Sequence, residues 1–240
     1  MKDLLSKAIK FAKEKHEGQT RKGSNKPYIT HIFAVAKILE EENADIKTII
    51  VGVLHDTLED TNTTIEELTK EFGVEISCMV DTLSEKKGLA YNDRKYMQAL
   101  RIKNSSKDVK MVKCADCLSN LTDTYKELKT NPNVWSKFNA SKQDIQKHYK
   151  DTLNALLELK GTKIYARLVN VYQNVFEETK TKYCTDCNFM KRIVTPDPYD
   201  WFCDDDERYV CGITNKTLSE ANRPYEKQVA PKNCPLEIER

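Results

Sequence analysis

The sequence predicts an all-α domain over residues 1–180, followed by a small cysteine-rich module over residues 181–240. Apolar residues recur at helical spacing through the first part, and strand-like alternation is scarce there. Near Tyr183 the pattern changes, because cysteines, prolines and short β-prone pieces replace the helical periodicity. A chain of 240 residues is long enough for one sizeable core and a small appendage.

The first helices are predicted from stripes of apolar side chains. Residues 4–12 place leucine, isoleucine, phenylalanine and alanine at helical spacing. The segment KGSNKPY, residues 22–28, interrupts this stripe with glycine and proline and is predicted to be a loop. The next two stripes cover residues 32–39 and 46–58, so two more helices are expected there.

The remaining helices follow from start signals and further stripes. Thr64 and Glu67 have the spacing of a capping box, which predicts a helix that ends near Phe72 and Gly73. Five more helices are expected at 75–83, 91–103, 107–128, 137–160 and 162–180. Together they predict a helical bundle.

Charge and hydropathy exclude several classes of protein. Charged residues make up 32% of the chain and the net charge is +2. Residues 1–180 hold 30 Lys and Arg against 26 Asp and Glu, which suits a phosphorylated small molecule but not a nucleic-acid polymer. No stretch approaches the roughly 18 apolar residues of a membrane helix, and the N-terminus lacks an apolar signal core. A cytoplasmic protein without a membrane partner is expected.

Five of the eight cysteines fall in the last sixty residues. Cys184 and Cys187 form a C-x-x-C pair, and Cys211 and Cys234 follow. Four thiolates in a small loop-rich module suit structural zinc, with Cys203 as an alternative ligand. The other interpretation is reduced thiols packed in a small apolar core. The module is expected to bind a partner or to cap the main domain.

The segment VGVLHDTLEDT, residues 51–61, carries ionisable side chains inside an apolar run. Burying such groups is costly unless each one is paired, hydrogen-bonded or bound to a metal. Residues three and four apart share one face of a helix, so His55, Asp56, Glu59 and Asp60 are expected to border one pocket. Imidazole and carboxylate together suit Mn, Fe or Zn.

Two further residues are candidates to complete this metal site. His31 begins the apolar helix of PYITHIFAVAKIL, and Asp116 is an acid within the apolar run VKMVKCADCLSNL. The alternative is that the His-Asp pair occurs by chance and that His31 packs at a helix end. His16 and His148 lie in polar sequence and are therefore not predicted to take part.

The segments RKGSNKPYITHIFAVAKIL, VGVLHDTLEDT and VKCADCLSNL occur in this order, and together they resemble the HD-domain hydrolases of the Rel/Spo type. More narrowly, the chain is similar to the small stand-alone alarmone hydrolases typified by the metazoan SpoT homologue, over about residues 3–176. The resemblance implies a helical HD domain that removes the 3′-pyrophosphate from guanosine tetra- and pentaphosphate, usually with Mn²⁺.

The resemblance also implies roles for particular residues. The metal ligands of the family correspond to His31, His55, Asp56 and Asp116. Its catalytic acid pair corresponds to Glu59 and Asp60. A bound Mn²⁺ lowers the pKa of water and polarises a phosphoryl oxygen, and Glu59 is placed to accept or orient the proton of that water. Asp60 is assigned a supporting role, or is a solvated acid at a helix end.

The resemblance implies a set of substrate contacts as well. Arg21 and Lys22 match the basic pair of the family beside the base and phosphates, and Asn120 matches its nucleoside-binding asparagine. Lys26 and Lys113 are candidate phosphate contacts by charge and position, although an ordinary surface lysine is the alternative. Tyr149 is a candidate to pack against the base of a guanine nucleotide.

Two departures from the family pattern concern the substrate. Cys117 stands where the family has a cation, and Asp123 follows the asparagine where the family has an arginine nearby. Both changes are expected to weaken binding of a highly charged alarmone. Two alternatives therefore stay open: a phosphohydrolase of another nucleotide such as NADPH, and a non-catalytic nucleotide sensor. Cys114 and Cys117 are predicted to be core residues, and self-association is left open.

Overall fold

The computed structural model describes residues 2–86, 88–176, 190–195, 206–211 and 217–220. Contacts between Cα atoms divide the chain into one unit over residues 1–178 and another over residues 179–240. This division lies within two residues of the boundary predicted from the change of sequence pattern.

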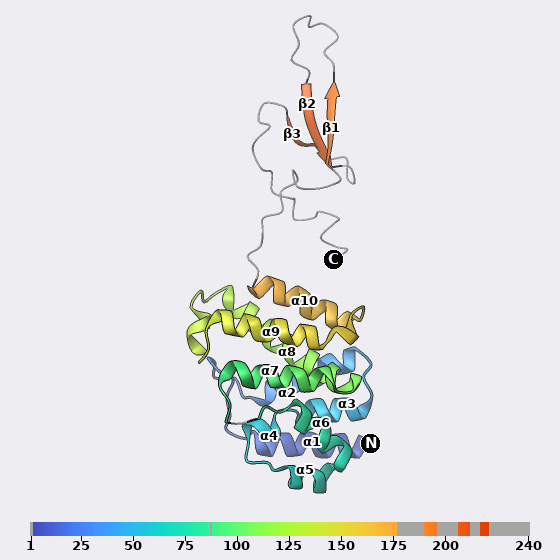
Figure 1. Cartoon of the computed structure of the whole chain (residues 1–240), viewed down its shortest axis with the longest axis vertical. Helices are drawn as coiled ribbons and strands as arrows, with labels where there is room; N and C mark the ends of the chain where they lie inside the picture. Colours follow the sequence, from blue (N-terminus) through green and yellow to red (C-terminus); the bar gives the residue numbers. More distant parts are fainter. Residues whose placement is uncertain (1, 87, 177–189, 196–205, 212–216, 221–240) are drawn as a thin grey trace, which may run out of the picture. The chain divides into compact units, whose positions relative to one another are not determined.

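The described part of the first unit is a bundle of helices, so the all-α prediction is confirmed (Figure 1). The α-helices are α1 (Lys2–Lys15), α2 (Ile29–Glu41), α3 (Ile46–Leu54), α4 (Thr57–Asp60), α5 (Ile65–Phe72), α6 (Val74–Leu83), α7 (Tyr91–Lys103), α8 (Lys107–Leu128), α9 (Lys142–Ala155) and α10 (Lys163–Phe176). Two short 3₁₀ helices are η1 (Val134–Lys137) and η2 (Leu157–Leu159).

Side-chain caps set where several helices begin and end. The Thr64 hydroxyl accepts a hydrogen bond from the backbone N–H of Glu67, so the predicted cap of α5 is present. The Glu67 carboxylate instead pairs with Lys15 on α1, so the reciprocal half of the capping box is missing. Gly73 ends α5 with a φ of +84°, a conformation that favours glycine.

Two predicted helices are interrupted. The segment 137–160 contains a break before α9, because the Ser141 side chain caps the N–H of Asp144 and starts the helix there. The segment 46–58 breaks after Leu54, where the Thr57 hydroxyl donates to the Leu54 carbonyl. His55 and Asp56 therefore lie at the junction of α3 and α4 and not inside one continuous helix.

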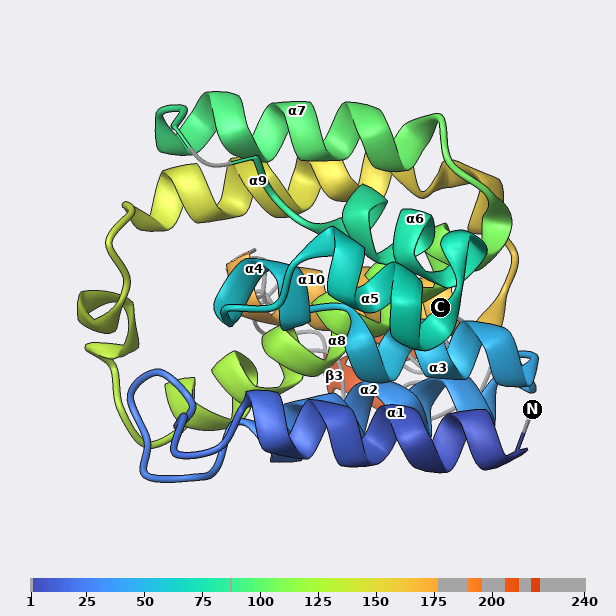
Figure 2. The same ribbon diagram turned by 90° about the horizontal axis from the view of Figure 1, so that it is seen from below.

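Helix α8 lies at the centre of the bundle, and twelve of its 22 residues are buried. It packs against α2, α3 and α10. Figure 2 shows α7 and α9 side by side along one edge of the bundle and α1 along the opposite edge. Helices α2 and α3 approach closely at Gly52, where an added Cβ would lie 2.4 Å from Leu39 Cδ1. This packing brings the N-terminal end of α2 and the C-terminal end of α3 to the middle of α8.

The described part of the second unit is an antiparallel sheet in the order β1-β2-β3. Its strands are β1 (Met190–Thr195), β2 (Asp206–Cys211) and β3 (Thr217–Glu220), and Met190 pairs with Cys211. The predicted zinc ligands Cys184, Cys187 and Cys234, and the alternative Cys203, lie outside the described residues. Among the described residues, none of the helices combines the length and hydrophobicity needed to cross a bilayer.

Candidate metal centre and active site

Three buried side chains from three helical segments meet in the first unit. His31 comes from the first turn of α2, His55 follows α3, and Asp116 lies in the middle of α8. Each offers one ligand atom, and these atoms all lie within 4.8 Å of one another. The three residues are only 2%, 3% and 7% exposed. This arrangement is suited to a metal ion.

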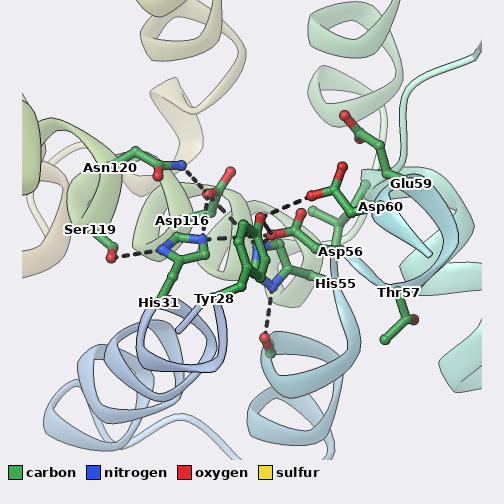
Figure 3. Close-up of polar contacts among 12 residues, drawn as sticks. Tyr28, His31, His55, Asp56, Thr57, Glu59, Asp60, Asp116, Ser119 and Asn120 are labelled. Carbon is green, nitrogen blue, oxygen red and sulfur yellow. Dashed lines mark hydrogen bonds and ion pairs between the residues drawn. The ribbon is translucent and has the colours of Figure 1, made fainter. Parts of the chain in front are cut away.

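Asp56 borders the same point (Figure 3). Its Oδ2 atom lies 2.9 Å from His55 Nε2 and 3.6 Å from His31 Nε2. Asp116 Oδ1 lies 3.4 Å from His31 Nε2 and 3.8 Å from His55 Nε2. The structure thus brings together all four residues that were predicted as ligands.

The outer nitrogens of the two imidazoles are held by hydrogen bonds. His55 Nδ1 donates to the Gly52 carbonyl at 2.8 Å, which leaves the lone pair of the neutral ring on Nε2. His31 Nδ1 lies 3.0 Å from Ser119 Oγ. Both Nε2 atoms are buried and have no hydrogen-bond partner among the described residues. Two imidazole nitrogens that make no hydrogen bond and face two carboxylates fit a divalent cation.

The electrostatics of the cluster favour positive charge at this point. Burial alone would lower the pKa of His55, but Asp56 and Asp116 raise that pKa well above its ordinary value of 6.5. Burial alone would raise the pKa of Asp116, but Lys113 and the two histidines hold it well below 3.8. Both carboxylates therefore stay ionised beside the imidazoles.

The predicted acid pair lies on the short helix α4 beside the cluster. Glu59 Oε2 accepts a hydrogen bond from the backbone N–H of Glu85 at 3.0 Å. Burial, followed by the charges of Glu85 and Asp56, raises the pKa of Glu59 to about 7. Partial burial and the charge of Asp56 raise the pKa of Asp60 above 3.8. Burial and the charge of Asp56 thus raise the pKa of both acids beside the candidate metal site.

A cavity of about 1050 Å³ opens onto these groups. His55, Asp56 and Asp116 line it together with Glu59 and Asp60. It is also lined by every residue that was predicted to contact substrate, namely Arg21, Lys22, Lys26, Lys113, Asn120 and Tyr149. The cavity therefore places the candidate ligands, acids and cations around one space.

Arg21 and Asn120 also support the metal cluster. The Arg21 guanidinium donates to Asn120 Oδ1 at 2.8 Å, and Asn120 Nδ2 donates to Asp116 Oδ1 at 2.6 Å. Arg21 forms an ion pair with Asp123 at 3.2 Å as well. Asp123, which departs from the family pattern, thus neutralises a cation of the cavity.

The other predicted contacts differ in how far they are buried. Lys113 is not a surface lysine, because it is 8% exposed and its Nζ lies 3.0 Å from Asp116 Oδ2. Lys22 and Lys26 are exposed, and the Lys22 ammonium lies 5.7 Å from the centre of the Phe138 ring. The Tyr149 ring contacts the rings of His148 and Phe176.

Sequence reasoning missed several residues of this region. The hydroxyl of Tyr28 reaches both Asp56 and Asp60, and the buried carboxylate of Glu85 pairs with Arg94 and Lys95. Tyr28 stands three residues before His31 in the segment PYITHIFAVAKIL. This closeness to a predicted metal ligand was the signal in the sequence that could have identified it.

His16 and His148 were set aside as metal-site candidates because their sequence surroundings are polar, and neither belongs to the cluster of His31, His55 and Asp116. Both rings are nevertheless buried, which the polar surroundings did not predict. His16 is 3% exposed and His148 is 8% exposed. The predicted burial of Cys114 and Cys117 is confirmed, with exposures of 0% and 2%.

A helical bundle with a largely buried cluster of two histidines and two aspartates is typical of metal-dependent hydrolases. The HD domain family matches residues 8–146, which is more than half of the chain. The chain belongs to the HD domain family, as the three sequence motifs predicted.

Curated relatives and solved structures agree with this membership. The guanosine-3′,5′-bis(diphosphate) 3′-pyrophosphohydrolase MESH1 of Xenopus tropicalis is 36% identical over 162 residues, which cover 66% of this chain and 86% of the relative. The human MESH1 is 35% identical over 161 residues, with the same coverage of 66% and 86%. A solved metazoan ortholog of SpoT, described as hydrolysing ppGpp, matches with a TM-score of 0.60 and 26% identity over 71% of this chain and 94% of that one.

A first prediction concerns folding stability and Glu59. Its pKa is 4.5 ordinarily and about 7 in the folded protein, so the folded state binds this proton more tightly. The contribution of Glu59 to stability is therefore fully present below pH 4.5 and is lost as the pH rises through 7. The unfolding free energy of metal-free Glu59→Gln, minus that of the metal-free wild type, should therefore rise by up to about 3 kcal/mol from pH 5 to pH 8. Urea unfolding with a chelator present at both pH values measures this difference.

Proposed function

We propose that the chain is a metal-dependent hydrolase that removes the 3′-pyrophosphate from guanosine 3′,5′-polyphosphates. The observation that carries this proposal is the cluster of His31, His55, Asp56 and Asp116. All of these except His31 line a cavity that also holds two acids and several cations. The names of the MESH1 relatives support the choice of substrate.

The metal ion of this site is proposed to be Mn²⁺, with the two imidazoles and two carboxylates as its ligands. Nitrogen and oxygen ligands of this kind suit Mn²⁺. Such an ion supplies Lewis acidity, lowering the pKa of water and polarising a phosphoryl oxygen. The hydrogen bonds to Gly52 and Ser119 keep the His55 and His31 rings oriented for this purpose.

Glu59 is proposed to be the general base of the reaction. A base whose pKa lies near the working pH combines the ionised form with enough basicity to take a proton. The Glu59 carboxylate accepts a proton from water as the water oxygen bonds to the phosphorus attached to the ribose 3′-oxygen. The bond between that phosphorus and the ribose 3′-oxygen breaks, and the 3′-oxygen takes up a proton from solvent, which leaves a 3′-hydroxyl group and free pyrophosphate. Asp60 is proposed to assist from the same turn of α4.

The cations of the cavity are proposed to bind the phosphates and the base. Arg21, Lys22 and Lys26 lie on the loop between α1 and α2, and Lys113 lies beside the metal cluster. A guanidinium and three ammonium groups offset part of the charge of a tetraphosphate. Asn120 and Tyr149 are proposed to contact the nucleoside.

A panel of phosphorylated nucleotides tests this proposal against its two alternatives. Full-length protein with Mn²⁺ should release pyrophosphate, and no orthophosphate, from guanosine tetraphosphate. Release of orthophosphate from NADPH, with the tetraphosphate left intact, would identify the other hydrolase. Binding of the tetraphosphate without turnover would identify a nucleotide sensor. A variant with Asp56 replaced by asparagine controls for contaminating phosphatases.

A second prediction concerns Asp123, which neutralises Arg21 at 3.2 Å. Replacing Asp123 with asparagine should free this cation for an anionic substrate and lower KM for guanosine tetraphosphate. Partly exposed ion pairs contribute about 0.2–1 kcal/mol, so KM should fall by up to about fivefold with kcat unchanged. Steady-state kinetics at low and high salt measure it, and an unchanged KM at low salt would count against the role of Arg21.

The cysteine-rich module is proposed to hold a structural zinc ion through Cys184, Cys187, Cys211 and Cys234. Full-length protein should then contain about one equivalent of zinc that a double Cys184→Ser, Cys187→Ser variant lacks. Equal zinc content in both proteins would refute the thiolate site.

The cytoplasmic location and self-association also stay predictions.

A further inference from the structure

The Tyr28 hydroxyl lies between two carboxylates of the candidate site. Its oxygen is 2.6 Å from Asp56 Oδ2 and 2.9 Å from Asp60 Oδ2 (Figure 3). Like charges so close together repel each other unless a donor lies between them. The single proton of the phenol is therefore shared between an acid that faces the metal cluster and an acid of the catalytic turn.

The residues that precede Tyr28 hold its ring and the helix α4 at the same time. The Tyr28 ring stacks on the His16 ring, with centroids 5.0 Å apart and planes 23° from parallel. Gln19 Nε2 donates to the backbone carbonyl of Asp60 at 2.8 Å, and Gln19 Oε1 accepts from His16 Nδ1 at 2.8 Å. Asp60 is thus fixed at both its backbone and its carboxylate by residues 16–28.

We propose that Tyr28 is a positioning residue of the metal site. Its hydroxyl, supported by His16 and Gln19, sets the separation between Asp56 and Asp60. Asp56 is thereby kept oriented toward the two imidazoles, and Asp60 is kept apart from them. This inference rests on the proposed function only in that a divalent cation binds the cluster.

The Tyr28→Phe variant tests this role because it keeps the ring and its stack on His16 and removes only the hydroxyl. Loss of a partner that orients a metal-binding carboxylate costs about 10- to 100-fold in metal affinity or activity. We expect calorimetry of full-length, metal-free protein to show Mn²⁺ binding weakened by about that factor. At saturating Mn²⁺, kcat should fall and KM for the nucleotide should change little.

Tyr96→Phe is the matched control, because Tyr96 lies on α7 and is 52% exposed. It should bind Mn²⁺ within about twofold of the wild type, as expected of a surface change. Mn²⁺ affinity of Tyr28→Phe within the same range, or a rise in KM with kcat unchanged, would overturn the proposal. If Tyr28→Phe lacks a cooperative unfolding transition, Gln19→Ala replaces it and must weaken Mn²⁺ binding by at least about threefold.

The two proposals fail separately. Mn²⁺ affinity is measured without nucleotide, so an unchanged affinity in Tyr28→Phe refutes the role of Tyr28 alone. Absence of pyrophosphate release by a wild type that binds Mn²⁺ refutes the substrate alone.

Discussion

The Asp56→Asn variant is expected to hydrolyse the substrate at least about a thousandfold more slowly and to bind Mn²⁺ much more weakly. Because the metal site then has one negative ligand fewer, it should stabilise the transition state by about 4 kcal/mol less than the wild type does. Asparagine keeps the shape of the side chain and an acceptor for the Tyr28 hydroxyl. It removes the charge that lies 2.9 Å from His55 Nε2. Initial rates of pyrophosphate release at saturating Mn²⁺ and calorimetric titration with Mn²⁺ measure the two effects.

The control is Asp45→Asn, which makes the same substitution at the N-terminal end of α3. Asp45 caps this helix by accepting from the N–H of Thr48 at 2.7 Å. Asparagine caps helices about as well as aspartate, so Asp45→Asn should keep the rate within about twofold. An Asp56→Asn protein that retains more than about one tenth of the rate would show that Asp56 is not a ligand.

The Glu59→Gln variant is expected to separate proton transfer from metal binding. Loss of a general base costs about 10²- to 10⁴-fold in kcat, whereas Mn²⁺ affinity should stay close to that of the wild type. The amide keeps the acceptor for the Glu85 N–H but cannot take a proton from water. Steady-state kinetics with Mn²⁺ at several pH values, together with calorimetry, measure both quantities.

Glu66→Gln on the next helix is the matched control, since Glu66 is exposed and lies in the first turn of α5. It should leave kcat within about twofold. Equal losses of kcat and Mn²⁺ affinity in Glu59→Gln would make Glu59 a metal ligand, and an unchanged kcat would assign the base to another group.

Local signals in the sequence predicted most of the bundle and the four candidate ligands. Helical periodicity and caps such as Thr64 act over a few residues, so they can be recognised without knowledge of the fold. Asp116 was found although it lies sixty residues beyond Asp56, because an acid within an apolar run needs a partner.

The rest depends on side-chain competition that periodicity does not report, or on contacts between distant segments. The break between α3 and α4 arises where the Thr57 hydroxyl bonds the Leu54 carbonyl, a local competition that periodicity does not report. The position of Tyr28 between Asp56 and Asp60 requires the loop before α2 to lie against α4, which only the folded chain reveals.

The most direct measurement uses full-length protein stripped of metal and guanosine tetraphosphate labelled in its 3′-pyrophosphate. Addition of about one equivalent of Mn²⁺ should restore release of labelled pyrophosphate together with an equal amount of guanosine diphosphate, and the stripped protein should release neither. Undiminished turnover in the stripped protein, or one tightly bound Mn²⁺ without any pyrophosphate released, would contradict the account.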